Sequence, residues 1–431
     1  MKELVNKLKG DRVIWSFVAL LALFSFMPVF SASSNLAYIG LGKGNTIGYL
    51  LKHLGHIGIG FLIIYWVHNV PYLYFRAISK GLLPVVWLLL AYALIKGTVI
   101  AGANASRWIQ IPFIKITFQP STLASIVLFV FVARYLSKKR EMPVDFKSSF
   151  LELWVPVFLT LLFILPSNFS TAALIFAMVL MLVFVGRYPL KYIGLIIGSG
   201  FLMLAFFVLI GKAFPDSKFF SRVGTWESRI ERFVSDKSDE DNYQIEKAKT
   251  AIASGGLYGL GPGKSVQKNF LPQSSSDFIF AIIVEEWGLL GGLSVLCLYL
   301  LLMFRFVIAS HKAPTLFGKL IVIALGFPMI FQAMINMAVA VELLPVTGQT
   351  LPLISSGGSS IWMTCFALGV ILSVTKKEAE IAKDVKDKQL REETLQKLID
   401  AHIQADSLTD ETEEKYTIED HANPMSAVAG R

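Results

Sequence analysis

The sequence predicts an all-α, polytopic membrane protein, and three observations support this prediction. First, 54% of the 431 residues are hydrophobic and only 16% are charged, unlike the usage of soluble domains. Second, apolar runs of about 20 residues recur along the chain, and a helix of that length crosses the hydrocarbon core of a bilayer. Third, Lys and Arg gather in every second loop between these runs, as the positive-inside rule requires.

We expect about ten membrane spans. The fifth apolar run is short and ends at Pro166, which favours a tilted or broken helix. The predicted spans are 12–31, 48–70, 82–101, 119–136, 152–166, 171–186, 190–213, 278–304, 317–340 and 355–375.

The basic loops set the predicted orientation. They include both chain ends, so both termini are predicted to be cytoplasmic, and this arrangement requires an even number of spans. The formal charge of +9 therefore reflects membrane topology rather than a nucleic-acid-binding patch.

Two regions flanking or interrupting the spans are not apolar. Residues 214–277 form a charged loop on the outer side, in which 227–234 and 244–254 read as short amphipathic helices. Residues 376–431 form a cytoplasmic tail. The sequence of its first half predicts a polar helix. Its last part is low in apolar residues, which predicts disorder. The predicted organisation is thus a cytoplasmic N-terminus (1–11), a membrane domain (12–375) and this tail.

The most informative acidic residue is Asp277, because it lies directly before the eighth apolar run. A carboxylate at the mouth of a span must be solvated, paired or functional. Glu285 and Glu286 lie inside the same run. Glu285 is about 12 Å further along the helix axis, which is too far for a glycosidase-type carboxylate pair. We expect both glutamates to pair with Lys or Arg on neighbouring helices or to line a hydrated cavity.

Several basic residues on the outer side are candidates for binding a phosphate. They are Lys52, Arg107, Arg222 and Lys268, each of which is equally explained as an interface anchor or a solvated surface charge. Trp108 could stack on a sugar or anchor the chain at the membrane interface. His53 and His56 lie close to Lys52, but two histidines without a third ligand are a weak metal signal.

Residues 343–360 (LLPVTGQTLPLISSGGSS) interrupt an apolar region with proline, glycine and hydroxyl residues. Irregular backbone at membrane depth is tolerated only where protein or a cavity covers it. This segment is therefore either a loop with a helix cap or the wall of a polar groove, and the groove interpretation makes candidates of Ser355, Gly357, Gly358 and Ser359.

A set of short motifs lies along the chain: SAS (31–33), ASRWI (105–109), QPS (119–121), YQ (243–244), GLGPG with KSVQK (259–268), LPQSSSDFIFAIIVEEWG (271–288) and TLPLISSGGSS (350–360). In combination they resemble the SEDS family (shape, elongation, division and sporulation), across nearly all of residues 12–375. The last of these motifs and the long tail favour its division branch over its rod-elongation branch.

The resemblance implies a peptidoglycan glycosyltransferase of the bacterial inner membrane that polymerises lipid II during septal wall synthesis. Asp277 matches the family's essential aspartate, and Trp108 matches its outer-loop tryptophan. Gln119 and Gln244 enter as substrate-binding candidates through their motifs. The implied partners are a class B penicillin-binding protein and other division proteins.

The sequence departs from the family pattern at several positions. Thr122 and Ser125 replace a Glu and a Lys, Asn168 stands at an aspartate position, Ser275-Ser276 replaces His-Thr, and Ser356 replaces a tyrosine. The Ser275-Ser276 change excludes a mechanism in which that histidine is the base.

The hypothesis is therefore that Asp277 is a general base in a single inverting displacement, with the leaving diphosphate held by cations or by a divalent ion (Mg²⁺ or Mn²⁺) partly bound to Asp277. Two alternatives remain: a lipid II flippase that uses Glu285 and Glu286 as a polar path, and a non-enzymatic division scaffold.

Overall fold

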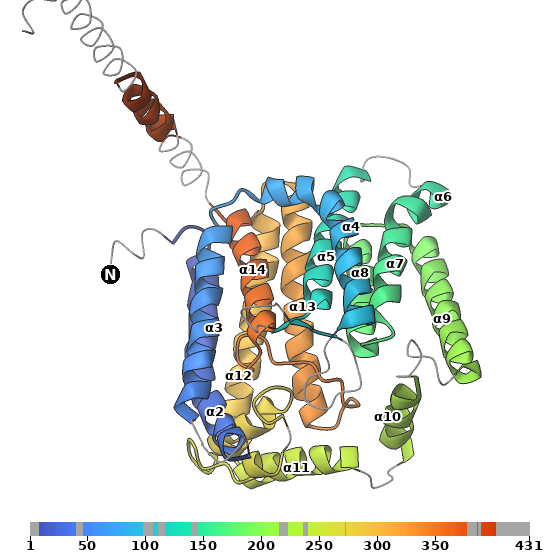
Figure 1. Ribbon diagram of the computed structural model, residues 1–431, viewed down its shortest axis with the longest axis vertical. Coiled ribbons are helices and arrows are strands. Elements are labelled where there is room, and N and C mark those ends of the chain that lie inside the picture. The colour runs from blue at the N-terminus through green and yellow to red at the C-terminus, as the bar shows by residue number, and fades with distance from the viewer. Residues whose placement is uncertain are drawn as a thin grey trace, which may run out of the picture. The chain divides into compact units, whose positions relative to one another are not determined.

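The protein is a helical bundle, seen here in a computed structural model (Figure 1). The structure describes residues 8–39, 46–97, 107–110, 117–139, 145–214, 223–235, 240–271, 273–376, 386 and 389–401. We call the end of the bundle near Asp277 the outer end and the end near Asp11 the inner end, following the predicted orientation.

Each of the ten predicted spans overlaps a helical segment, but the third, predicted at 82–101, belongs to a helix that begins ten residues earlier, at Tyr72. The segments are α2 (Arg12–Ile39), α3 (Thr46–Val67), α4 (Tyr72–Lys96), α5 (Pro120–Lys139), α6, η1 and α7 (Phe146–Ile164 together), α8 (Phe169–Val185), α9 (Leu190–Ala213), α12 (Ile279–Lys312), α13 (Leu316–Ala340) and α14 (Gly358–Val374). Eight of them are long and apolar enough to cross a membrane, and α8 and α14 are shorter apolar helices. The chain is thus a helical polytopic membrane protein.

The fifth span is irregular, as its sequence suggests. It begins with α6 (Phe146–Ser149), passes through a π-helical turn at Phe150–Trp154, and continues as α7 (Val155–Ile164). Trp154 in the π turn is fully buried, and its indole nitrogen donates to the Tyr188 hydroxyl at 3.2 Å. The widened turn lets a large aromatic side chain reach the core.

The centre of the bundle is formed by α5 and α13. In the most apolar stretch of each helix, 72% of the residues of α5 and 61% of those of α13 are buried. The corresponding share is 17% in α9, which lies at the edge of the bundle (Figure 1). The helices α3 and α14 pack against each other, as do α12 and α13. The last span, α14, also contacts α13.

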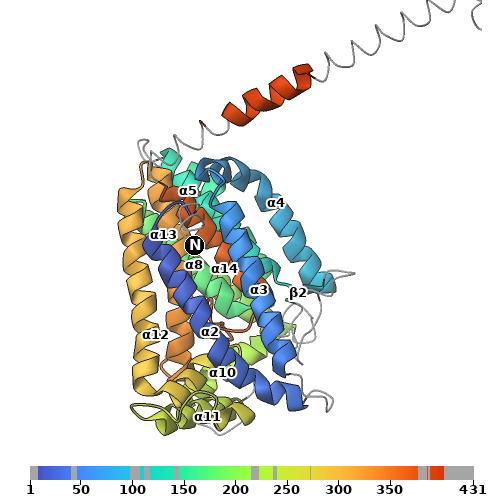
Figure 2. The ribbon, with the colours of Figure 1, turned by 90° about the vertical axis from the view of Figure 1, so that its left-hand side faces the viewer.

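The outer end carries the non-spanning elements. Two helices lie there, α10 (Val223–Ser235) and α11 (Glu240–Gly255), and both views place α11 across the end of the bundle (Figures 1 and 2). They coincide with the two amphipathic helices expected in the outer loop, with each helix a few residues longer. A short antiparallel pair, β1 (Ile109–Gln110) and β2 (Thr117–Phe118), precedes α5.

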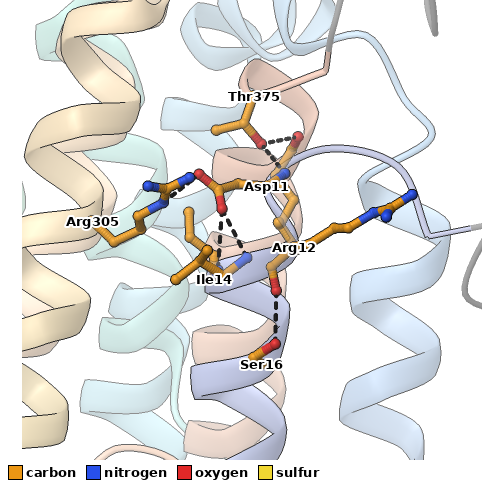
Figure 3. A network of polar contacts seen from close by, with 8 residues as sticks. Asp11, Arg12, Ile14, Ser16, Arg305 and Thr375 are labelled. Atoms are coloured by element: carbon orange, nitrogen blue, oxygen red, sulfur yellow. Dashed lines mark hydrogen bonds and ion pairs between the residues drawn. The ribbon is translucent and has the colours of Figure 1, made fainter.

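The inner end is tied together by a polar network around Asp11 (Figure 3). The Asp11 carboxylate accepts from the backbone amides of Val13 and Ile14 and pairs with Arg305 Nε of α12 at 2.7 Å. The Asp11 amide donates to Thr375 Oγ1, at the end of α14, at 2.9 Å. The start of the first span is thus linked to α12 and to the end of the last span.

Residues 376–431 form a separate unit. Its described part is helical at 386 and 389–401, in the half for which a polar helix is predicted. The segment predicted to be disordered lies outside the described residues.

Candidate functional site

Asp277 lies in the turn that leads into α12. The turn covers residues 273–278, and the helix begins two residues after Asp277, at Ile279. The Asp277 side chain is half-buried, whereas Phe278 and Ile279 are fully buried. The apolar residues therefore anchor the turn and leave the carboxylate at the boundary between protein and the outer side.

The backbone before Asp277 is held by the segment that precedes α14. Ser355 Oγ donates to the Ser276 carbonyl at 2.6 Å, and the Ser356 amide donates to the Ser275 carbonyl at 2.8 Å. Ser355 Oγ also accepts from the Leu351 amide at 2.7 Å, which fixes its position. The structure thus brings Ser355 to the turn that carries Asp277, although the two lie far apart in the sequence.

A second set of hydrogen bonds holds Asp277 from α13. Asn336 Nδ2 donates to the carbonyls of Asp277 and Gln349, both at 2.7 Å. Gln349 Nε2 in turn donates to Thr171 Oγ1 of α8 at 3.0 Å. A Cβ built on Gly348 would lie 3.4 Å from Asp277 Oδ2, so this glycine faces the carboxylate.

A cavity of about 410 Å³ opens beside this group of residues. Its wall includes Val346 and Thr347, which adjoin Gly348, and Ile335, which adjoins Asn336. Apolar residues form most of the lining, and the polar groups are Arg107, Ser167, Asn168, Ser170, Thr225 and Thr347. Pockets of this kind, mostly apolar with a few placed polar groups, are typical of ligand sites.

The start of α8 shapes one end of the cavity. Asn168 is the N-cap residue of α8, and its side chain accepts from the Thr171 amide at 3.2 Å. Asparagine is a preferred N-cap, so the substitution of the family's aspartate at this position retains a capping side chain. From the opposite side, Trp226 of α10 stacks on Phe207 of α9 and contacts Phe169 of α8.

Glu285 and Glu286 hold the glycine-rich segment that follows α11. Both are buried, at 0% and 1% exposure. Glu285 accepts from Ser265 Oγ and from the amides of Val266 and Gln267, the latter two at 3.0 and 3.2 Å. Glu286 Oε1 accepts from Ser31 Oγ. Hydroxyls and backbone amides are thus their partners, and among the described residues neither glutamate forms the ion pair with Lys or Arg that the sequence suggested. Glu286 Oε2 has no hydrogen-bond partner in the described part of the chain.

The same segment is docked on the backbone of α12 through glycines. Gly288 has a positive φ of 69°, which divides α12 into two helical parts. A Cβ built on Gly288 would lie 2.3 Å from the Leu257 carbonyl oxygen, and one on Gly259 would lie 2.2 Å from that of Glu286. The two chain segments approach so closely that only glycine fits at these points.

Lys268 lies on this docked segment. Its Nζ donates to Ser31 Oγ at 3.1 Å and to the Gly263 carbonyl at 2.8 Å. Since Ser31 also bonds Glu286, the lysine, the first span and α12 are joined through one hydroxyl. Lys268 thus has a role in the packing of the loop besides its predicted role in binding phosphate.

The other predicted site residues within the described part of the chain lie on or beside four elements. Gln119 donates through Nε2 to Ser121 Oγ at 2.9 Å, beside the start of α5. Trp108 is half-buried next to β1, and Gln244 is half-buried on α11. Lys52 is exposed on α3. Arg222 lies outside the described residues.

Sequence reasoning misses or undervalues several residues of the site. Asn336 is a polar residue inside an apolar run, which is itself a signal of function or of a buried hydrogen bond. Gly348 lies in the irregular 343–360 segment but gives no separate signal.

The possible metal site gains no support from the donor set. Among the described residues, no three His, Cys, Asp or Glu side chains gather in a way that could hold a metal ion. His53 Nε2 bonds Ser25 Oγ at 2.9 Å, whereas His56 Nδ1 bonds the Lys52 carbonyl at 2.7 Å, so these rings have separate partners. We therefore derive no step through a metal.

Fold and site together define a class: a helical polytopic membrane protein with an acidic residue at the mouth of a span, beside a largely apolar cavity. A family model described as "Cell cycle protein", FTSW_RODA_SPOVE, matches residues 11–380. The chain belongs to this family, and the resemblance to SEDS proteins is thereby confirmed.

Curated relatives support the same assignment. Stage V sporulation protein E of Bacillus subtilis is 30% identical, covering 86% of this chain and 98% of the relative. A protein named "Probable peptidoglycan glycosyltransferase FtsW" from Geobacter sulfurreducens is 32% identical, covering 85% and 95%. The "Peptidoglycan glycosyltransferase MrdB" of Escherichia coli is 28% identical, covering 89% and 98%.

Solved structures show the same fold. A chain from "Structural coordination of polymerization and crosslinking by a peptidoglycan synthase complex" aligns with a TM-score of 0.66 and 25% identity, covering 85% of this chain and 97% of that one. The rod shape determining protein RodA of Thermus thermophilus aligns with a TM-score of 0.59 and 24% identity, covering 85% and 96%.

Proposed function

We propose that this protein is a peptidoglycan glycosyltransferase that polymerises lipid II at the outer face of the cytoplasmic membrane, with Asp277 as the general base. The observation that carries the proposal is the half-buried Asp277 carboxylate, held at the mouth of α12 and faced by Gly348, whose neighbours Val346 and Thr347 line the 410 Å³ cavity. Family membership and the names of the relatives support the same activity.

The reaction needs one base and a stabilised leaving group. The 4-hydroxyl of the acceptor sugar attacks the anomeric carbon of the donor, and Asp277 takes the hydroxyl proton. The new C–O bond forms as the bond between the anomeric carbon and the lipid diphosphate breaks, and the configuration inverts. Proton transfer by a positioned side chain contributes about 10²–10⁴-fold in rate.

Hydrogen bonds to the backbone at and before Asp277 fix the position of this residue, which suits the role of a base. Asn336 holds the Asp277 carbonyl, and Ser355 holds the Ser276 carbonyl. Both donors come from helices or segments packed in the bundle, so the carboxylate is placed by rigid elements, which favours a fixed reacting geometry.

The cavity supports binding of part of the substrate. Its apolar lining suits a polyprenyl segment, and Arg107 is the cation in its wall that suits a phosphate or a sugar acid. At about 410 Å³ the cavity holds a portion of a lipid-linked disaccharide peptide, so the rest of the head group lies outside it.

We infer a transpeptidase of the class B penicillin-binding type as the partner and the division septum as the place of action. The related peptidoglycan synthase complex of known structure coordinates polymerization and crosslinking, which supports such a partner. Relatives include FtsW and MrdB proteins at similar identity, so the rod-elongation role is the alternative for the same chemistry.

The flippase alternative is not favoured by the geometry. Glu285 and Glu286 are buried beneath the docked glycine segment; both Glu285 oxygens and Glu286 Oε1 bind Ser31, Ser265 and backbone amides, and Glu286 Oε2 has no hydrogen-bond partner among the described residues. A transport path would need polar groups that face an open route. Head-group translocation in proteoliposomes that depends on Glu286 and not on Asp277 would restore this alternative.

The test is polymerisation of labelled lipid II by the purified chain with its transpeptidase partner. We expect long glycan products from the wild type and none from Asp277→Ala or Asp277→Asn with normal folding. Equal products from wild type and Asp277→Asn would remove Asp277 from the chemistry. An Asp277→Glu variant that gained activity with added Mg²⁺ or Mn²⁺ would favour the metal-ligand role over the general-base role.

A further inference from the structure

Tyr299, in the middle of α12, is a fully buried polar residue that the proposed reaction does not use. Its side chain is 0% exposed, and its hydroxyl donates to the carbonyl of Pro352, in the segment that precedes α14. A tyrosine hydroxyl inside a membrane span is costly unless it is bonded. Pro352 lies in irregular backbone, so the same bond also satisfies a carbonyl that has no place in a helix.

Two side-chain amides of α13 hold the same segment. Gln332 Nε2 donates to the Thr350 carbonyl at 2.9 Å. Asn336 Nδ2, one helical turn further along, donates to the Gln349 carbonyl at 2.7 Å. Together with Tyr299, these side chains bind three backbone carbonyls of the segment, each of which would be costly at membrane depth without a partner. We call Tyr299, Gln332 and Asn336 the clamp.

The backbone that the clamp holds is strained. Leu353, directly after Pro352, has a positive φ of 65°, which is unfavourable for a leucine. Such a conformation persists only where its surroundings enforce it. The Tyr299 bond fixes the residue before Leu353, and Ser355 Oγ, two residues after it, accepts from the Leu351 amide at 2.7 Å. The strained residue is therefore held from both sides.

The clamped segment meets the turn of Asp277 at two points. Near its start, a Cβ built on Gly348 would lie 3.4 Å from Asp277 Oδ2. At its end, Ser355 Oγ donates to the Ser276 carbonyl at 2.6 Å. The carbonyls bound by the clamp lie between these two points. A shift of the segment would therefore move the carboxylate of Asp277.

We propose that Tyr299 and Gln332 are positioning residues for Asp277, which act by holding segment 348–355 against the turn that carries the base. This inference rests on the proposed function, since it concerns the placement of that base. Tyr299 is sealed in the core and reaches the turn only through the segment. Loss of its hydroxyl would misplace the carboxylate without removing a group from the site, which slows the reaction more than it weakens substrate binding.

The first test compares two tyrosine-to-phenylalanine variants in polymerisation of labelled lipid II by the chain with its transpeptidase partner. Tyr299→Phe removes only the hydroxyl that binds Pro352. We expect kcat to fall about tenfold or more, with a change in KM of less than about twofold.

The matched control is Tyr72→Phe. Tyr72 is 9% exposed on α4, and its hydroxyl bonds Thr315 Oγ1 at 3.0 Å near the inner end of the bundle. This variant also loses a hydrogen bond of a buried tyrosine, but it should keep the wild-type kcat. Equal losses of kcat in the two variants would assign the effect to general loosening and overturn the proposal. An unchanged kcat in Tyr299→Phe, or a change in KM alone, would overturn it as well.

A double variant tests the route. Ser355→Ala cuts the same path at its end, where the segment bonds the Ser276 carbonyl. Once either bond is lost, the other no longer transmits the position of the segment, so the fold losses in kcat of Tyr299→Phe and Ser355→Ala should not multiply. Losses that multiply would show that Tyr299 acts by another route. Gln332→Met keeps the side-chain length but removes the donor to Thr350, and wild-type kcat in this variant would exclude Gln332 from the role.

Hydrogen exchange of the full chain in lipid nanodiscs reads the clamp without any activity. In Tyr299→Phe, peptides that cover 348–356 and 273–278 should exchange faster than in the wild type, and in Tyr72→Phe they should not. If Asp277→Asn polymerises like the wild type, the proposed function fails, while faster exchange in Tyr299→Phe still supports the clamp. If Tyr299→Phe changes neither exchange nor kcat while Asp277→Asn is inactive, only the inference fails.

Discussion

At the scale of single residues, the main finding is how the two buried glutamates are used. Glu285 lies in the helix that follows Asp277, but its carboxylate faces the glycine-rich segment and accepts three hydrogen bonds from it. A buried carboxylate is tolerated when it is well bonded, and here the bonds also fix the chain that leads to Asp277. Glu285 is therefore a positioning residue for the outer loop.

We predict that Glu285→Ala destabilises the protein more than Ser265→Ala. The first change leaves one hydroxyl and two amides without an acceptor, a loss of about 3 kcal/mol or more. The second removes two bonds, the one to Glu285 and the one from the Lys268 amide, at about 2 kcal/mol. Thermal unfolding in detergent, followed by tryptophan fluorescence, gives the ranking. Equal losses in the two variants would contradict the three-bond role of Glu285.

Asn336 offers a second test at this scale. Its Nδ2 donates to the Asp277 carbonyl, so Asn336→Ala frees the turn that carries the base. We predict a fall in kcat of about tenfold or more with little change in KM, because a misplaced base affects the transition state. Met334→Ala, an exposed position on the same helix, serves as the control. A change in KM alone would assign Asn336 to substrate binding.

At the scale of elements, α12 joins the site to the interior. Asp277 precedes its outer end, Gly288 divides it, and Arg305 lies near its inner end. The outer part of the helix packs with α11 and with the glycine-rich segment. The break at Gly288 allows the Leu289 and Leu290 amides to bond the carbonyls of Gly256 and Leu257.

We predict that Gly288→Ala prevents the outer loop from docking. The residue has φ 69°, and a Cβ would lie 2.3 Å from the Leu257 oxygen, so strain and steric overlap together cost about 3 kcal/mol or more. The yield of monodisperse protein after detergent extraction is the measurement. Gly198→Ala, where a Cβ meets nothing within 4 Å, should be extracted like the wild type.

At the scale of the whole molecule, the membrane unit is closed by contacts between its first and last spans. Asp11 caps the first span, pairs with Arg305 and donates its amide to Thr375 (Figure 3). The side chain of Asp11 is only 9% exposed, so removing one partner of its pair with Arg305 leaves a poorly solvated charge uncompensated, which costs more than breaking a surface salt bridge.

We predict that Asp11→Ala lowers stability by about 2 kcal/mol, through the lost cap and the uncompensated Arg305. Arg305→Ala should cost less, since Asp11 retains its capping bonds. In the double variant the two losses should not add, because both changes break the same pair. Additive losses in thermal unfolding would show that the pair contributes nothing.

The orientation of the whole membrane unit is also testable. With Cys297 and Cys365 replaced by Ser, single cysteines at Ser276 and at the exposed Lys312 should react with a membrane-impermeant reagent from opposite sides. The positive-inside pattern places Ser276 outside and Lys312 inside. Labelling of both positions from the outside of intact cells would contradict the orientation on which the proposed function depends.

The sequence by itself determined the ten helical segments and the two outer helices, and it singled out Asp277 as the candidate base. It could do so because these features are local: apolar length, amphipathic period and charge placement are properties of neighbouring residues. Only the tertiary structure decided the partners of Glu285 and Glu286, the support of Asp277 by Ser355 and Asn336, and the contact of Tyr299 with Pro352. Each of these joins residues 18 or more positions apart, because helix packing brings distant segments together and no pattern along the chain records which side chains will meet.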